Sequence, residues 1–94
     1  MADKSAGAIL DEVEAERARQ IKKGYDAEHD DLHGAGELAG GAAAYALSDD
    51  YPGAAQDQWP WIEKFKPKDR RTNMIRAMAM LLAEVERLDR IANQ

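Results

Sequence analysis

Residues 59–71 combine aromatic and basic side chains in a pattern that is typical of binding to a planar anion. The segment holds both tryptophans and the only phenylalanine of the chain, interleaved with lysines and arginines. Aromatic faces stack on bases or other flat groups, while lysine and arginine neutralise phosphates. We expect Arg70 and Arg71 to begin a helix, whose free N–H groups also favour anions. The alternative is that Trp59 and Trp61 only fill a small core beneath a loop.

Two polar residues interrupt an apolar helical stripe near the N-terminus. The stripe consists of Ala6, Ile9, Leu10, Val13 and Ile21. Its helical period also includes Arg17 and Gln20, which we therefore expect to point inward. A buried arginine stays charged and requires a carboxylate or phosphate partner, so Arg17 forms either an internal ion pair or a ligand contact. The internal carboxylates available to it are Asp30, Asp31, Glu37 and Glu84.

Acidic and imidazole side chains are concentrated in residues 28–37, and such a set could bind a divalent metal ion. His29, His33 and Glu37 are four residues apart and would share one face of a helix. The glycines between them disfavour a continuous helix, so the alternative is a hydrogen-bonded turn in which an aspartate caps the next element.

A metal-dependent hydrolase is a further possibility, because the chain resembles the all-α nucleotide pyrophosphohydrolases in size and helicity. Those enzymes hold magnesium with pairs of carboxylates on neighbouring helices. The candidate ligands here are Glu28, Asp31, Glu86 and Asp89. The alternative is a solvated face on which these acids form salt bridges with nearby arginines.

The composition disfavours several other kinds of chemistry. Cysteine is absent, which excludes disulfides, thiolate zinc sites and cysteine nucleophiles. Serine and threonine are scarce, and no phosphate-binding loop, nucleophile elbow or dinucleotide fingerprint occurs. We therefore assign no catalytic residue and favour a binding protein over an enzyme. No cofactor is expected, except magnesium under the hydrolase alternative.

Length and charge limit the architecture and the partners. The 94 residues indicate a single domain, residues 1–94, with a net charge of −5. An acidic chain is a poor general binder of nucleic acid. No apolar run is long enough for a membrane span or a signal peptide, so we expect neither membrane contact nor export, and a location in the cytoplasm.

The sequence predicts an all-α fold, a small bundle of three main helices and one short helical turn. The main helices are expected at 5–23, 35–48 and 69–92. A loop that can include one helical turn is expected at 24–36, and a surface loop at 49–58. Ser5 and Asp69 are the predicted N-caps. The short turn is expected to begin at Asp57 or Gln58 and to end at Pro67.

An apolar seam on the last helix is predicted to pack inside the bundle and against a second copy. Its residues are Met74, Met78, Leu81, Val85, Leu88 and Ala92, with Ile75 and Leu82 beside them. Their spacing alternates between four and three, as in a coiled coil. A thin layer of helices would leave part of this seam exposed, so we expect a homodimer or a higher homo-oligomer.

A series of short motifs extends over residues 12–90. They are Glu16-Arg17, Arg19-Gln20, Gly24-Tyr25, Glu28-His29-Asp30-Asp31, Gly36-Glu37-Leu38-Ala39, Tyr45-Ala46, Trp59-Pro60-Trp61, Lys66-Pro67, Arg70-Arg71 and Ala83-Glu84-Val85-Glu86-Arg87-Leu88-Asp89-Arg90. This series resembles a widespread family of small helical bacteriophage and prophage proteins. The resemblance implies a phage accessory protein with no established activity. By analogy, such proteins act against host defence by sequestering a nucleotide signal or by docking on a defence protein.

The leading hypothesis is a module that binds a small anionic, nucleotide-like ligand. The residues expected to form its site are Arg17, Gln20, His29, Asp30, Trp59, Trp61, Lys66 and Arg71. The tryptophans would stack on the ligand, and Lys66 and Arg71 would neutralise its phosphate. The alternatives are a protein-docking inhibitor of a host protein and the hydrolase described above.

Overall fold

The computed structural model describes residues 3–32 and 36–94, which form α-helices joined by loops, with no strand in these two ranges. The helices are α1 (Ala6–Lys22), α2 (Ala27–Leu32), α3 (Glu37–Leu47), α4 (Pro52–Gln58) and α5 (Arg70–Ala92). This confirms the all-α prediction. Among the described helices, none has both the length and the apolar composition needed to cross a lipid bilayer.

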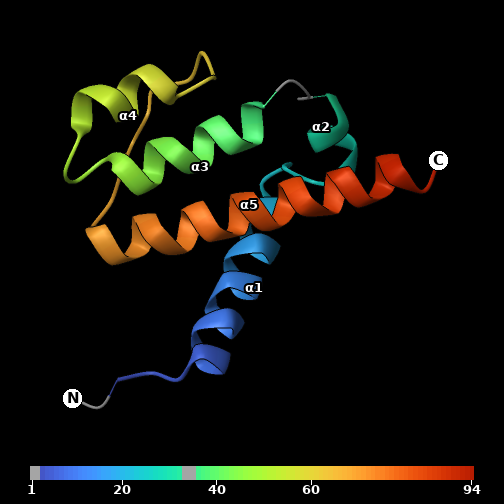
Figure 1. Cartoon of the computed structure of the whole chain (residues 1–94), viewed down its shortest axis with the longest axis horizontal. Coiled ribbons are helices and arrows are strands. Elements are labelled where there is room, and N and C mark those ends of the chain that lie inside the picture. The colour runs from blue at the N-terminus through green and yellow to red at the C-terminus, as the bar shows by residue number, and fades with distance from the viewer. Residues whose placement is uncertain (1–2, 33–35) are drawn as a thin grey trace.

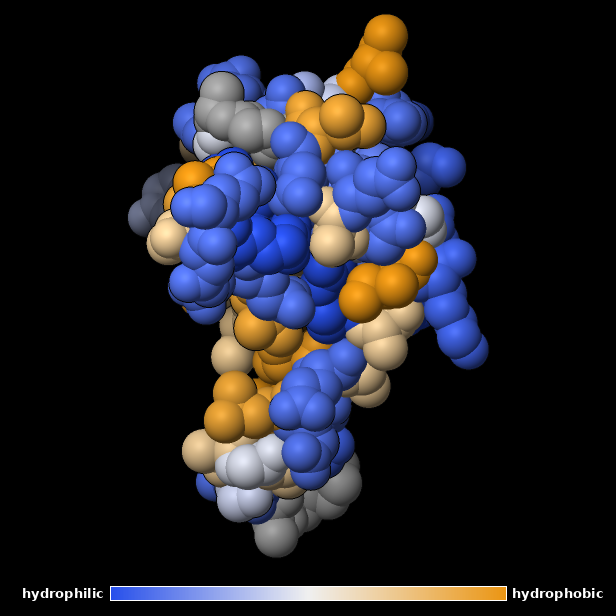
Figure 2. Space-filling view, turned by 90° about the vertical axis from the view of Figure 1, so that its right-hand side faces the viewer, coloured by the Kyte–Doolittle hydropathy of each residue, from blue (hydrophilic) through white to orange (hydrophobic). Residues whose placement is uncertain are grey.

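Helix α5 is the central element of the fold. Figure 1 shows α3 along one side of α5, with α4 outside α3, and α1 leaving the other side at a steep angle. The helix begins at its predicted cap, because the Asp69 carboxylate accepts a hydrogen bond from the Thr72 N–H at 3.1 Å. Its interior contains neither proline nor glycine, so nothing interrupts it before Ala92. On the face shown in Figure 2, apolar surface is exposed along the lower part of the molecule, where α1 projects.

The short helix lies earlier in the chain than the sequence predicted. Residues 52–58 were expected to be a loop, but they form α4, with Pro52 in the first turn, where its missing N–H costs nothing. The expected helical turn between Gln58 and Pro67 does not form. Trp59 is extended, with φ −65° and ψ 114°, because it precedes Pro60. Residues 59–69 therefore run as a non-helical strap from α4 to α5.

The predicted seam of α5 is not the face that packs inside the molecule. The residues of α5 that are buried are Asn73, Ala77, Ala79, Met80 and Ala83. By contrast, Met74 is 36% exposed and Val85 is 54% exposed. The cause is the facing helix α3, whose buried residues are Leu38, Gly41, Ala42 and Ala44. A helix surface of mostly small residues packs closely on another small-residue face, and here that face is the alanine stripe of α5.

The strap is fastened to the rest of the fold by a buried asparagine. Asn73 is only 1% exposed, and its Nδ2 group donates to the Lys68 carbonyl and to Ser48 Oγ, each at 2.9 Å. Its Oδ1 atom accepts a hydrogen bond from the Lys68 N–H at 2.7 Å. One side chain of α5 therefore holds both the end of the strap and the end of α3.

A buried ion pair joins α1 to α2 and α5. Arg17 is 6% exposed and Asp30 is 0% exposed, and Arg17 Nη2 donates to Asp30 Oδ2 at 2.9 Å. Arg17 Nε also donates to Glu86 Oε1 at 3.0 Å, and Nη1 donates to the Tyr25 carbonyl at 2.7 Å. Because each guanidinium nitrogen has a partner, the charge is compensated inside the protein.

Removal of the Asp30 carboxylate tests how much this ion pair contributes to the free energy of unfolding. Asp30→Ala leaves Arg17 with a buried, partly uncompensated charge, so we expect the free energy of unfolding to fall by about 3 kcal/mol. The matched control is Asp31→Ala, which removes the exposed pair between Asp31 and Arg90 and should cost less than about 1 kcal/mol. Urea denaturation followed by circular dichroism measures both, and equal losses would contradict a structural role for the buried pair.

Candidate functional site

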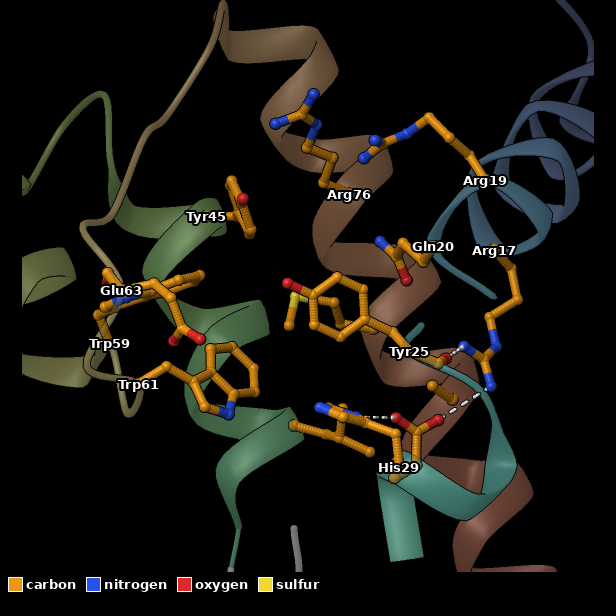
Figure 3. A pocket seen from close by; sticks show the side chains of 14 residues that line it. Arg17, Arg19, Gln20, Tyr25, His29, Tyr45, Trp59, Trp61, Glu63 and Arg76 are labelled. Carbon is orange, nitrogen blue, oxygen red and sulfur yellow. Dashed lines mark hydrogen bonds and ion pairs between the residues drawn. The ribbon is translucent and has the colours of Figure 1, made fainter. Parts of the chain in front are cut away.

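A cavity of about 150 Å³ lies between α1, α3, α5, the residues around α2 and the beginning of the strap. It is lined by Arg17, Arg19, Gln20, Tyr25, His29, Asp30, Leu38, Tyr45, Trp59, Trp61, Glu63, Arg76, Met80 and Ala83. Figure 3 shows these side chains from close by, with aromatic rings on both sides of the space and arginines along one edge. Such a mixture of aromatic surface and a few polar groups is typical of a ligand-binding site.

The strap supplies one aromatic wall. The rings of Trp59 and Trp61 meet edge to face, with centroids 4.8 Å apart, and Tyr45 of α3 meets Trp59 in the same way at 5.7 Å. Trp59 Nε1 donates to the Glu63 carbonyl at 2.7 Å, which closes the strap into a turn. Gly41 of α3 makes room for this wall, because a Cβ atom there would lie 2.4 Å from the Trp61 ring.

The opposite wall is held by the buried ion pair. Tyr25 and His29 meet edge to face with ring centroids 5.0 Å apart. The Tyr25 carbonyl accepts from Arg17, and His29 Nδ1 lies 3.5 Å from Asp30 Oδ1. The Arg17–Asp30 pair therefore fixes the backbone and one ring of this wall.

Arg19 at the edge of the cavity is compensated by a neighbour on its own helix. Its Nε and Nη2 atoms donate to the Glu16 carboxylate at 2.7 and 2.6 Å. Burial opposes ionisation of Glu16, but the bonds from Arg19 outweigh it, and the pKa of Glu16 lies below its ordinary value. Gln20 donates to the same carboxylate at 3.1 Å, so its amide is held at the cavity edge.

Arg76 differs from the other arginines of the cavity. Its Nε atom is buried and has no hydrogen-bond partner among the described residues. The guanidinium carbon lies 5.8 Å from the centroid of the Tyr45 ring, a cation–π contact. Burial of a donor without an acceptor is unfavourable, so this guanidinium is a place where an anionic group would bind.

A carboxylate lies across the cavity from Arg76. Figure 3 shows the Glu63 carboxylate directed from the strap toward the space between the walls. In the part of the chain that the structure describes, no cation pairs with it. The cavity therefore offers a guanidinium on one side and a hydrogen-bond acceptor on the other.

The structure brings six of the eight predicted ligand-binding residues to this cavity. They are Arg17, Gln20, His29, Asp30, Trp59 and Trp61. Of the two roles predicted for Arg17, the structure shows the internal ion pair. Its guanidinium donates to Asp30, Glu86 and a backbone carbonyl. The expectation that it also contacts a ligand receives no support from this geometry.

Lys66 and Arg71, expected in the same site, do not line this cavity. Arg71 lies in the first turn of α5, but it points to α1, where its Nη1 and Nη2 donate to the Glu12 carboxylate at 2.8 and 2.7 Å. Lys66 is exposed near the far end of the strap. Both placements follow from the extended strap, which separates these residues from the indoles.

Two of the four candidate magnesium ligands pair with arginines. Asp31 pairs with Arg90 at 2.7 Å, and Glu86 pairs with Arg17 at 3.0 Å. Within residues 3–32 and 36–94, no group of three or more histidine, aspartate or glutamate side chains could hold a metal ion. His33, part of the predicted metal cluster, lies outside the described residues.

Sequence reasoning missed the residue that distinguishes this cavity. Arg76 lies beyond the aromatic and basic segment 59–71, and the sequence predicted the seam of larger residues as the inner face of α5. Arg76, Met80 and Ala83 recur at intervals of four and three and share one face of the helix. The sequence feature that could have indicated an inward-facing Arg76 was its position on the same helix face as Met80 and Ala83.

Comparison with known proteins adds no further information. No protein family, curated protein or solved structure matches this chain. The resemblance to small phage proteins therefore stays a prediction.

Replacement of Gly41 by alanine tests the packing of the strap wall. The new methyl group would meet the Trp61 ring at 2.4 Å and the Met80 methyl at 2.5 Å, so Trp61 must move. Overpacking typically lowers the free energy of unfolding by about 1–3 kcal/mol, and the better helix propensity of alanine offsets part of this loss. We expect a net loss of stability and a red shift of tryptophan emission.

Gly53→Ala is the matched control, because nothing lies within 4 Å of the added Cβ atom. This change on α4 should raise stability by about 0.5–1 kcal/mol and leave the emission unchanged. If Gly41→Ala behaved in the same way, the indole would not pack on α3.

The contact between Glu12 and Arg71 predicts a pH dependence. The hydrogen bonds from Arg71 hold the pKa of Glu12 at about 2, below its ordinary value of 4.5. A carboxylate with a lowered pKa in the folded state stabilises the fold fully above pH 4.5, and this contribution is lost as the pH falls toward 2. Glu12→Gln should therefore reduce the loss of folding stability that occurs as the pH falls from 4.5 toward 2.

A carbon-detected NMR titration of the Glu12 carboxyl measures the shift directly. Arg71→Gln should move the pKa of Glu12 back toward 4.5. Arg70→Gln, which removes the separate pair with Asp50, should leave the Glu12 titration unchanged. An equal response to the two substitutions would contradict the assignment.

Proposed function

We propose that this protein binds a small, planar, anionic ligand of the nucleotide class in the cavity between α1, α3, α5 and the strap. The observation that carries the proposal is Arg76, a partly buried guanidinium whose Nε atom has no acceptor among the described residues. An incoming phosphate or carboxylate supplies that acceptor and restores the hydrogen bond.

The size of the cavity determines how much of such a ligand it holds. Sites for drug-sized molecules occupy about 300–1,000 Å³, whereas this cavity measures about 150 Å³. One ring or one phosphate therefore sits inside, and the remainder of the ligand extends over the rim. Trp59 and Trp61 lie half-buried at that rim. Trp59 packs on Phe65 with ring centroids 4.8 Å apart, so Trp61 is the ring proposed to stack on the ligand.

The carboxylate of Glu63 further restricts the class of ligand that the cavity favours. A carboxylate at the wall disfavours a ligand that is negative throughout, but it accepts hydrogen bonds from ring N–H or amino groups. The favoured ligand therefore carries its negative charge toward Arg76 and a donor-bearing heterocycle toward Glu63. A purine nucleotide has this distribution of groups.

We further propose that binding serves to sequester the ligand. The resemblance to phage accessory proteins supports this role, in which the ligand is a nucleotide signal of host defence and the protein acts in the host cytoplasm. Retention without turnover distinguishes this role from the hydrolase alternative, which requires metal-dependent release of phosphate or pyrophosphate.

Binding is tested by thermal shift and calorimetry against a panel of purine and pyrimidine mono-, tri- and cyclic nucleotides, with and without magnesium. We expect at least one purine nucleotide to raise the melting temperature without release of phosphate. Arg76→Gln should weaken its binding at least tenfold, because a charge-assisted hydrogen bond is worth about 1.5–3 kcal/mol.

Arg71→Gln is the control, since it removes an arginine of α5 that lies outside the cavity. Its affinity for the nucleotide should equal that of the parent protein. The proposal fails if no nucleotide shifts the melting temperature, or if Arg76→Gln and Arg71→Gln bind equally well. Metal-dependent release of phosphate would replace it with the hydrolase function.

A further inference from the structure

Large apolar side chains form a stripe on the outer face of α5. We call this the outer stripe; its residues are Met74, Met78, Leu81, Val85 and Leu88, which are 36%, 38%, 48%, 54% and 50% exposed. Their spacing of four, three, four and three places them along one edge of the helix, the pattern of a coiled-coil seam. No described residue of this chain covers them enough to bury them, so the stripe is an unpartnered helix face.

The surface area of the whole chain supports a partner for this face. A compact monomer of 10.4 kDa exposes about 5,400 Å², whereas this chain exposes 6320 Å². The excess of roughly 900 Å² is spread over an elongated molecule, and it is of the order of the ~800 Å² that each partner contributes to a standard stable interface. The radius of gyration agrees, because it is 13.6 Å against about 12 Å for a compact chain of this length.

We infer that the outer stripes of two copies pack together, giving an antiparallel homodimer centred on Leu81. Met74 and Leu88 lie seven residues on either side of Leu81. A twofold axis through Leu81 therefore sets Met74 of one copy against Leu88 of the other. The stripe is in this way complementary to itself, which is what an isologous interface requires.

Charge at the two ends of the stripe decides the direction of pairing. The N-terminus of α5 carries a partial positive charge and its C-terminus a partial negative charge, because the peptide dipoles of the helix are aligned. Antiparallel pairing sets the N-terminus of each helix beside the C-terminus of the other. Parallel pairing would instead set the like ends of the two dipoles side by side.

The proposed interface leaves the cavity accessible. Arg76, Met80 and Ala83 line the cavity from α5, and their helical positions are on nearly the opposite side from the outer stripe. The dimer therefore presents two outward-facing cavities, and dimerisation can be tested separately from ligand binding.

Sedimentation equilibrium gives the first test. We expect the parent protein to sediment at twice 10.4 kDa, and Leu81→Lys to raise the dimer dissociation constant at least a hundredfold. The control is Ile62→Lys, since Ile62 is 100% exposed on the strap and lies outside the outer stripe. Both variants should keep the helical circular dichroism of the parent, because neither position is buried within one chain.

Cysteine cross-linking tests the direction, because the parent chain contains no cysteine. Under mild oxidation, Leu81→Cys should form a covalent dimer with itself. Met74→Cys and Leu88→Cys should cross-link efficiently only when mixed. Self-linking of Met74→Cys at the rate of Leu81→Cys would show parallel pairing and overturn the proposed arrangement. A parent protein that stays monomeric at all concentrations, including one that instead binds a helix of another protein, would overturn the dimer itself.

Discussion

The fold depends first on the compensation of one buried guanidinium. Arg17 comes from the interior stripe of α1, and it meets Asp30 of α2, Glu86 of α5 and the backbone carbonyl of Tyr25. A charge removed from water requires such partners, so α1 and α2 can dock on α5 only in the arrangement that provides them. The same contacts place Tyr25 and His29, and hence one wall of the cavity.

The second constraint is the unequal distribution of side-chain size. The interface between α3 and α5 consists largely of alanine and glycine, which permits close approach but buries little apolar area for each residue. The aromatic side chains Tyr45, Trp59 and Phe65 supply the missing volume from one side. The large aliphatic residues of α5 stay outside, so the hydrophobic material of a small chain is divided between its own core and a surface available to a second copy.

The sequence predicted the helical class, the caps at Ser5 and Asp69, and the inward position of Arg17, because these follow from local chemistry and from periodicity. The prediction failed where one sequence pattern is compatible with two ways of packing a helix. On α5, both the alanine stripe and the outer stripe have helical spacing, and only the small residues of α3 decide which face packs inside. The position of the strap depended on Pro60, whose effect on Trp59 was not anticipated. The alignment of Arg76 with the cavity needed the packing of three helices, which no local pattern specifies.

The two walls of the cavity differ in how they are anchored. Tyr25 and His29 belong to a segment held by the buried ion pair. The strap is non-helical, and it is held at its beginning by the bonds of the Trp59 N–H to α4 and near its end by Asn73. Segments with few internal hydrogen bonds open at lower free energy than packed helices. The tryptophan wall is thus the less firmly anchored of the two, and the ion-paired wall is the more firmly anchored one.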